Sequence, residues 1–381
     1  MSTFVIFTSN GLITPRDPKY YFEDGSTIFL VGGRLFKIQR SLLTSQSEVF
    51  QDMFQIPQKY NGESSSSSME GSTDQNPITI PQVTATQFQT LLLFFYGKHV
   101  HGSVTDPDYR SLVLDAADES NRNPQSFRRY LDIASLSHRF SMEAIEKWAL
   151  GQFKRVMQSS ARITSSFSSH TDLLEALSYS KLTSDRDLEY DVRNMAQCYT
   201  CVLKPYLLNP FWLSQIMVLY RNSQLKKEDP AVFGHLFCLV LSEGHTSSLW
   251  AAFNRDERAK LFAAQAYLTP LPSSLATSWI QNTNEISSGV DNTQRSSCFY
   301  SCAQSLTNRA NQLFKAHELT KDSPLAGVKA LTMIPTQRQQ LAEGAPKLAK
   351  CTCTRQLLTV IDAKIDKLFT ELAASYHDRL D

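Results

Sequence analysis

Residues 27–38 read TIFLVGGRLFKI, and residues 40–54 continue as RSLLTSQSEVFQDMF. Two short apolar runs around a Gly-Gly pair predict a β-hairpin, because a two-residue turn of the common type needs positive φ, which glycine adopts at little steric cost. The apolar spacing that follows predicts two short helices. The hairpin must bury one of its faces, so we expect helices to cover it and the fold class to be α+β.

The next segments repeat these signals around one polar interruption. Residues 45–48 (SQSE) and 84–87 (TATQ) have the spacing of capping boxes, in which two side chains satisfy free amides at a helix start. Residues 78–80 predict a short strand, and residues 88–96 predict a helix. Residues 57–77 include five consecutive serines and few apolar side chains, which predicts a flexible insertion.

The 381-residue chain has room for two or more domains. We expect an N-terminal tail at residues 1–18, a first domain at residues 19–158 and an all-helical region at residues 159–381. Residues 282–297 are rich in Asn, Ser and Thr, which predicts a linker inside that region. The clearest helical stripe of the second region consists of Leu188, Val192, Met195, Tyr199 and Val202.

Charge and composition exclude several classes of function. Lys and Arg number 38 against 37 Asp and Glu, so no global charge is present to hold nucleic acid or an anionic membrane. The longest apolar run, Leu91 to Tyr96, is far too short to span a bilayer. Seven cysteines and no Asn-x-Ser/Thr site do not fit a secreted disulfide scaffold. We therefore expect an intracellular protein with reduced thiols, located in the cytoplasm, the nucleus or both.

The order of these short motifs resembles the BTB/POZ domain, and more narrowly the uncharacterised fungal BTB proteins. The resemblance covers residue 20 to about residue 158. It implies a helical cluster with a short three-stranded sheet, followed here by the all-α region. Arg40 matches a basic position of the family, while the family's usual Asp and His appear as Ser26 and Gln39. By the same resemblance, the core residues are Phe36, Leu42, Leu43, Val49, Phe50, Met53 and Phe54.

The resemblance implies a function in protein association. A scaffold or recruitment protein without catalysis is the first hypothesis. A substrate adaptor of a cullin-type ubiquitin ligase and a nuclear transcriptional co-regulator are the alternatives. Other proteins are therefore the expected partners, with a homodimer through the BTB domain or a cullin scaffold among the candidates. The sequence does not identify the residues that bind a partner.

The sequence contains no motif of a catalytic site or of a cofactor site, so we expect neither an enzyme nor a cofactor. Cys198 and Cys201 form a Cys-x-x-Cys pair, but they lie in the helical stripe without a second pair at zinc-module spacing, which favours buried thiols. A composite zinc site is the alternative use of cysteine. It would combine Cys298 and Cys302, four residues apart on one helix, with Cys351 and Cys353. Nothing local sets the geometry of that site, so packing is the default interpretation.

Overall fold

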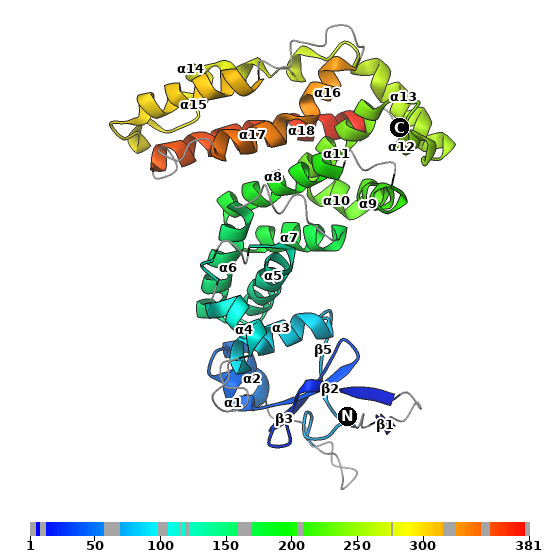
Figure 1. The fold of residues 1–381 in the computed structure, drawn as a ribbon, viewed down its shortest axis with the longest axis vertical. Helices are drawn as coiled ribbons and strands as arrows, with labels where there is room; N and C mark the ends of the chain where they lie inside the picture. The colour runs from blue at the N-terminus through cyan, green and yellow to red at the C-terminus, as the bar shows by residue number, and fades with distance from the viewer. Residues whose placement is uncertain are drawn as a thin grey trace. The chain divides into compact units, whose positions relative to one another are not determined.

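The computed structural model divides the chain into two compact units, residues 1–159 and residues 160–381 (Figure 1). The structure describes residues 5–7, 13–56, 69–97, 106–114, 116–118, 122–158, 169–203, 209–275, 277–314, 325–343 and 351–377. Within these ranges, none of the helices combines the length and the apolar character needed to cross a membrane.

A mixed sheet forms the N-terminal part of the first unit. Its described strands are β1 (Val5–Phe7), β2 (Ile13–Tyr21), β3 (Thr27–Val31), β4 (Arg34–Ile38) and β5 (Ile78–Ile80). They lie in the order β1-β2-β4-β3-β5, with β1/β2 and β3/β4 antiparallel and β2/β4 and β3/β5 parallel. The sheet therefore extends beyond the expected three strands, because β1 and β2 add to the edge formed by β4.

The hairpin turn agrees with its prediction. Val31 pairs with Arg34, so the turn has two residues, and Gly32 and Gly33 adopt φ values of 53° and 76°. A Cβ at Gly32 would lie 2.4 Å from the backbone nitrogen of Ala85. Glycine is thus required at position 32 for two reasons: its positive φ and the close approach of the helix that begins at Ala85.

Residues 13–18, which we expected in a tail, are part of β2. Pro15 and Pro18 argue against a regular strand, because proline cannot donate to a sheet ladder. The strand tolerates them through an irregular register between Arg16 and Tyr21. Asp17 is buried in this irregular segment and accepts hydrogen bonds from the backbone amides of Lys19 and Tyr20. The tail prediction is therefore wrong for these residues.

Helices complete the first unit. They are α1 (Arg40–Thr44), α2 (Glu48–Gln55), α3 (Ala85–Tyr96), α4 (Pro107–Tyr109), the π-helix η1 (Arg110–Leu114), α5 (Pro124–Arg139) and α6 (Glu143–Gln158). Thr84 and Gln87 form the predicted capping box of α3. The predicted box at residues 45–48 is wrong, because Ser45 ends α1 and the extended Ser47 caps α2 instead.

Part of the predicted flexible insertion is ordered. Residues 57–68 lie outside the described residues, but residues 69–77 form turns against the sheet. Asp74 is buried there and accepts hydrogen bonds from Arg16 at 2.6 Å and from the hydroxyl of Tyr21 at 2.5 Å. Those tertiary bonds order a segment whose composition alone predicts flexibility.

The second unit is mostly helical, and its described residues include no strand. Its α-helices are α7 (His170–Leu182), α8 (Arg186–Leu203), α9 (Pro210–Arg221), α10 (Ser223–Glu228), α11 (Pro230–Glu243), α12 (Ser248–Ala251), α13 (Arg255–Tyr267), α14 (Thr283–Ser287), α15 (Phe299–Phe314), α16 (Ala326–Thr332), α17 (Ile334–Glu343) and α18 (Thr352–His377). Among the described residues, the 3₁₀ turns η4 (Ser273–Leu275), η5 (Ser278–Gln281) and η6 (Asn292–Gln294) lie between α13 and α15.

The central helix of this unit is α11, whose residues 231–242 are all buried. It packs against α8, α16 and α18. Asp229 caps its start by accepting from the amide of Val232, and Gly244 follows its end with a φ of 76°. The predicted stripe of α8 faces inward, since Leu188, Val192, Met195 and Tyr199 are buried; the side chain of Val202 lies outside the description.

Residues 282–297, which we expected to form a linker, lie inside the second unit. They include α14 and η6, and they bury Ile286 and Val290. Arg295 donates to the carbonyls of Ser287 and Val290, which closes the segment on itself. The polar composition predicted a linker, but two buried apolar side chains and this arginine suffice to order it.

Candidate functional site

The interior of the first unit is an aromatic cluster between the hairpin and its helices. Phe29 of β3 lies with its ring centre 5.9 Å from that of Phe50 and 6.0 Å from that of Phe88, and Phe36 of β4 lies 5.1 Å from Phe88. All four rings are essentially inaccessible to solvent. Burial of each large apolar side chain contributes roughly 1.5–3 kcal/mol, so this cluster joins α2 and α3 to the sheet.

The structure places the expected core residues in three groups. Phe36, Leu43 and Phe50 are buried, and Leu42, Met53 and Phe54 are half-buried. Val49 is 39% exposed, so its assignment to the core is wrong. The reason is helical geometry: α2 turns Phe50 toward the sheet, and Val49 lies about 100° around the helix from it.

Ser26 and Gln39, which stand at the family's usual Asp and His positions, both form hydrogen bonds through their side chains. The Ser26 hydroxyl accepts a hydrogen bond from the amide of Arg40 at 2.9 Å. The side-chain nitrogen of Gln39 donates to Asp24 at 3.0 Å, and its side-chain oxygen accepts from the hydroxyl of Tyr96 at 2.5 Å. These bonds join the end of the hairpin to α1 and α3.

The outer face of α2 carries apolar side chains that reach solvent. Val49 is 39% exposed, Ile56 just past the helix end is 67% exposed, and Met53 between them is half-buried. Their spacing of four and three residues places them on one stripe. Glu48 and Asp52, both exposed, border it. The stripe, Val49-Met53-Ile56, is therefore an apolar surface with an acidic edge.

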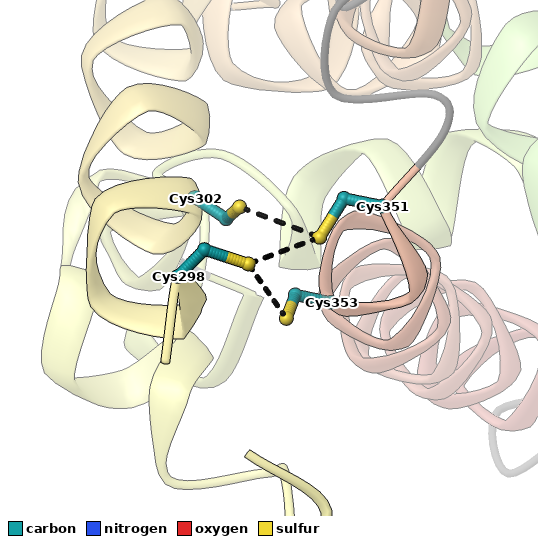
Figure 2. A group of neighbouring side chains, drawn as sticks. All are labelled: Cys298, Cys302, Cys351 and Cys353. Atoms are coloured by element: carbon teal, nitrogen blue, oxygen red, sulfur yellow. Dashed lines mark hydrogen bonds between the residues drawn. The ribbon is translucent and has the colours of Figure 1, made fainter. Parts of the chain in front are cut away.

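The second unit brings together four cysteines that are far apart in the sequence. Cys298 immediately precedes α15 and Cys302 lies in its first turn, whereas Cys351 immediately precedes α18 and Cys353 lies in its first turn. Figure 2 shows the four side chains pointing into the space between these two helices. We call these four residues the cysteine cluster.

The sulfur atoms of the cysteine cluster all lie within 4.8 Å of one another. The Sγ of Cys298 lies 3.3 Å from that of Cys351 and 3.7 Å from that of Cys353, and the Sγ atoms of Cys302 and Cys351 are 3.8 Å apart. Cys302 and Cys353 are buried, Cys351 is half-buried and Cys298 is exposed. The cluster therefore has a closed inner side and an open outer side.

A serine that the sequence analysis did not consider completes the surroundings of the cluster. The Ser296 hydroxyl lies 3.1 Å from the Sγ of Cys298 and 2.7 Å from the Sγ of Cys353. Hydrogen bonds from Ser296, and then from Cys351 and Cys353, lower the pKa of Cys298 to about 7. Burial raises the pKa of Cys302 to about 12. The sequence places Ser296 only two residues before Cys298, but serine is so common that this spacing does not predict a contact with the cysteines.

The remaining cysteines do not join the cluster. Cys198 is buried in α8, and burial raises the pKa of its thiol. Cys201 lies 3.5 Å from Nε2 of the buried His235, a pairing that could suggest a nucleophile and its base. The carbonyl of Thr332, however, lies 3.0 Å from the thiol and 3.3 Å from the same ring nitrogen. The Cys201 thiol donates to that carbonyl, and Nδ1 of the same ring lies 3.1 Å from the hydroxyl of Thr200, so we assign these groups to a buried packing network.

A comparison with protein families identifies the first unit. The BTB/POZ domain model matches residues 24–119, which include the hairpin, α1, α2, β5 and α3. Neither curated proteins nor solved structures give a match to this chain. A BTB/POZ domain is generally a module for protein–protein interaction rather than for catalysis. Residues 24–119 of this protein form a BTB/POZ domain, followed by a mostly helical C-terminal region.

Proposed function

We propose that this protein is a non-catalytic recruitment protein, which binds a partner protein through its BTB/POZ domain. The observation that carries the proposal is the match of residues 24–119 to that domain. The aromatic cluster supports it, because a hairpin packed on two helices is a rigid base from which surface residues can contact a partner.

The apolar stripe of α2 is the surface on which we expect the partner to bind. Solvent-exposed apolar side chains that lie side by side cost free energy in water and gain it when a partner covers them. Glu48 and Asp52 along the edge favour positive charge opposite them. The expected occupant is therefore a segment of another protein that presents an apolar face bordered by Lys or Arg, most simply an amphipathic helix.

A binding measurement with matched variants tests this proposal. The full chain first captures partners from extract, and each candidate is then purified and titrated against the chain by calorimetry. Ile56→Glu should weaken binding by about tenfold or more, because it places a charge in an apolar contact. Leu182→Glu changes a side chain of similar exposure in the second unit, 63% against 67%, and should leave binding unchanged.

The same measurement separates the competing functions. A ligase adaptor must bind a purified cullin scaffold, and light scattering of the full chain reports self-association through the BTB domain. If every purified partner binds Ile56→Glu as tightly as the unaltered chain, the proposed surface is wrong. If no candidate binds the folded chain at micromolar concentration, the recruitment function itself is wrong.

A further inference from the structure

The cysteine cluster has the dimensions of a single-ion site. In a tetrahedral zinc site each sulfur lies about 2.3 Å from the ion, so neighbouring sulfurs are about 3.8 Å apart. Three pairs of the cluster are separated by 3.3, 3.7 and 3.8 Å, and no pair exceeds 4.8 Å. Shifts of about 1 Å or less in side-chain position would convert this arrangement into a regular tetrahedron.

Other uses of four cysteines fit these distances less well. A disulfide brings its two sulfurs to about 2.05 Å, so two disulfides would sort the four thiols into two close pairs. Cys351 instead lies at similar distances from both Cys298 and Cys302. An iron–sulfur cluster places several atoms between its cysteines, whereas a separation of at most 4.8 Å leaves room for one ion.

The ends of two helices face the cluster and can offset the negative charge of thiolates, the form of cysteine that binds a metal. Both pairs of cysteines lie at the N-termini of long helices, α15 with 16 residues and α18 with 26. The positive end of each helix dipole stabilises negative charge there. Four thiolates on a divalent ion carry a net charge of about −2, and the two helix ends and the Ser296 hydroxyl offset part of it.

We propose that Cys298, Cys302, Cys351 and Cys353 bind one Zn²⁺ ion, which holds the start of α15 to the start of α18. Four sulfur ligands complete the coordination of zinc, so the site is structural and leaves no open position for a substrate. The ion would close the chain segment that contains α16 and α17. Because the ligands come from two helices that are distant in sequence, binding stabilises the folded second unit.

Metal analysis of the purified chain tests this site. The full chain is prepared without an affinity tag and under reducing conditions, and its metals are measured by mass spectrometry. We expect about one zinc ion per chain. Cys298→Ser and Cys353→Ser should each lower the zinc content severalfold, and Cys201→Ser, which changes a cysteine outside the cluster, should not. Circular dichroism confirms that each variant is folded.

A cobalt titration of the zinc-free protein gives a reading that does not depend on any variant. Tetrahedral Co²⁺ with four thiolates produces intense visible absorption and a thiolate charge-transfer band, and added Zn²⁺ should abolish both. The proposal is overturned if the folded, reduced chain binds neither ion, if iron is the metal present, or if non-reducing mass analysis finds the cluster cysteines in disulfides. It is also overturned if Cys298→Ser and Cys353→Ser retain full zinc content.

Discussion

Gly234 offers a direct test of the packing that forms the helical unit. It lies in α11 at the point of contact with α18. A Cβ added there would lie 1.8 Å from the carbonyl oxygen of Phe369, 2.7 Å from its carbonyl carbon and 3.2 Å from the nitrogen of Ala373. These atoms belong to helix backbone, so no side-chain rotation can relieve the clash. Gly234→Ala must therefore move α18 away from α11.

The expected loss of stability in Gly234→Ala follows from how closely the added Cβ would approach the backbone of Phe369. A Cβ essentially never approaches another heavy atom closer than 3.0 Å, whereas the unshifted backbone would leave only 1.8 Å here. Overpacking a core costs about 1–3 kcal/mol, and a backbone obstacle should place this case at the upper end. The higher helix propensity of alanine returns up to about 1 kcal/mol. We expect a net loss of about 2 kcal/mol in the free energy of unfolding.

Hydrogen exchange followed by mass spectrometry measures this loss within the affected unit. Peptides from α11 should exchange about 30-fold faster in Gly234→Ala, because about 1.4 kcal/mol corresponds to a factor of ten. Gly151→Ala is the matched control. A Cβ at this exposed position of α6 meets nothing within 4 Å. Alanine should therefore slow exchange of α6 through a gain of about 0.5–1 kcal/mol.

The Gly234→Ala variant also separates the packing of α11 on α18 from the proposed zinc site. Phe369 lies in the C-terminal half of α18, several helical turns away from Cys353 in the first turn. Gly234→Ala should therefore destabilise the unit while it still binds one zinc ion. If α11 of the variant exchanges within about twofold of the unaltered chain, the close approach of α11 and α18 is wrong.

Three further predictions concern the cysteine cluster, the hairpin and the carboxyl group of Asp366. Ser296→Ala should weaken zinc binding by about tenfold or more in a chelator competition, because hydrogen bonds to the ligands of a metal site tune their affinity for the metal. An unchanged zinc affinity would show that Ser296 does not support the site. Phe29→Ala should lower the free energy of unfolding of the first unit, measured by urea denaturation, by about 3–5 kcal/mol. Val49→Ala, at an exposed position, should lower it by about 0.5 kcal/mol or less. Similar losses for the two variants would contradict the assigned core. Burial raises the pKa of Asp366 from 3.8 to about 7. Between these two pH values the carboxyl group is protonated in the folded state and ionised in the unfolded state. The free energy of unfolding should therefore fall as the pH rises from the lower value to the higher one. In Asp366→Asn, the decrease of stability with pH should become shallower by up to about 1.4 kcal/mol per pH unit, as measured by thermal unfolding. An unchanged pH profile would refute the raised pKa of Asp366.

Local rules predicted the parts of the fold in which one short segment decides its own conformation. The Gly32-Gly33 turn and the Thr84-Gln87 capping box both follow from conformational preferences of a few adjacent residues. Two of the errors, the tail and the flexible insertion, have a shared cause in tertiary contacts. The prolines of β2 and the polar residues 69–77 are ordered by Asp17 and Asp74, whose bonding partners include residues distant in the sequence.

The sequence by itself determined the hairpin, the helices that cover it and the resemblance to the BTB/POZ domain, because hydrophobic periodicity and capping act within a few residues. It also supplied the four cysteines, but only the tertiary structure decided that they meet. Cys302 and Cys351 are 49 residues apart. Their sulfurs come within 3.8 Å because the packing of α15 against α18 aligns the starts of the two helices. No spacing rule within a single segment can encode that alignment, since it depends on burial of apolar faces throughout the second unit.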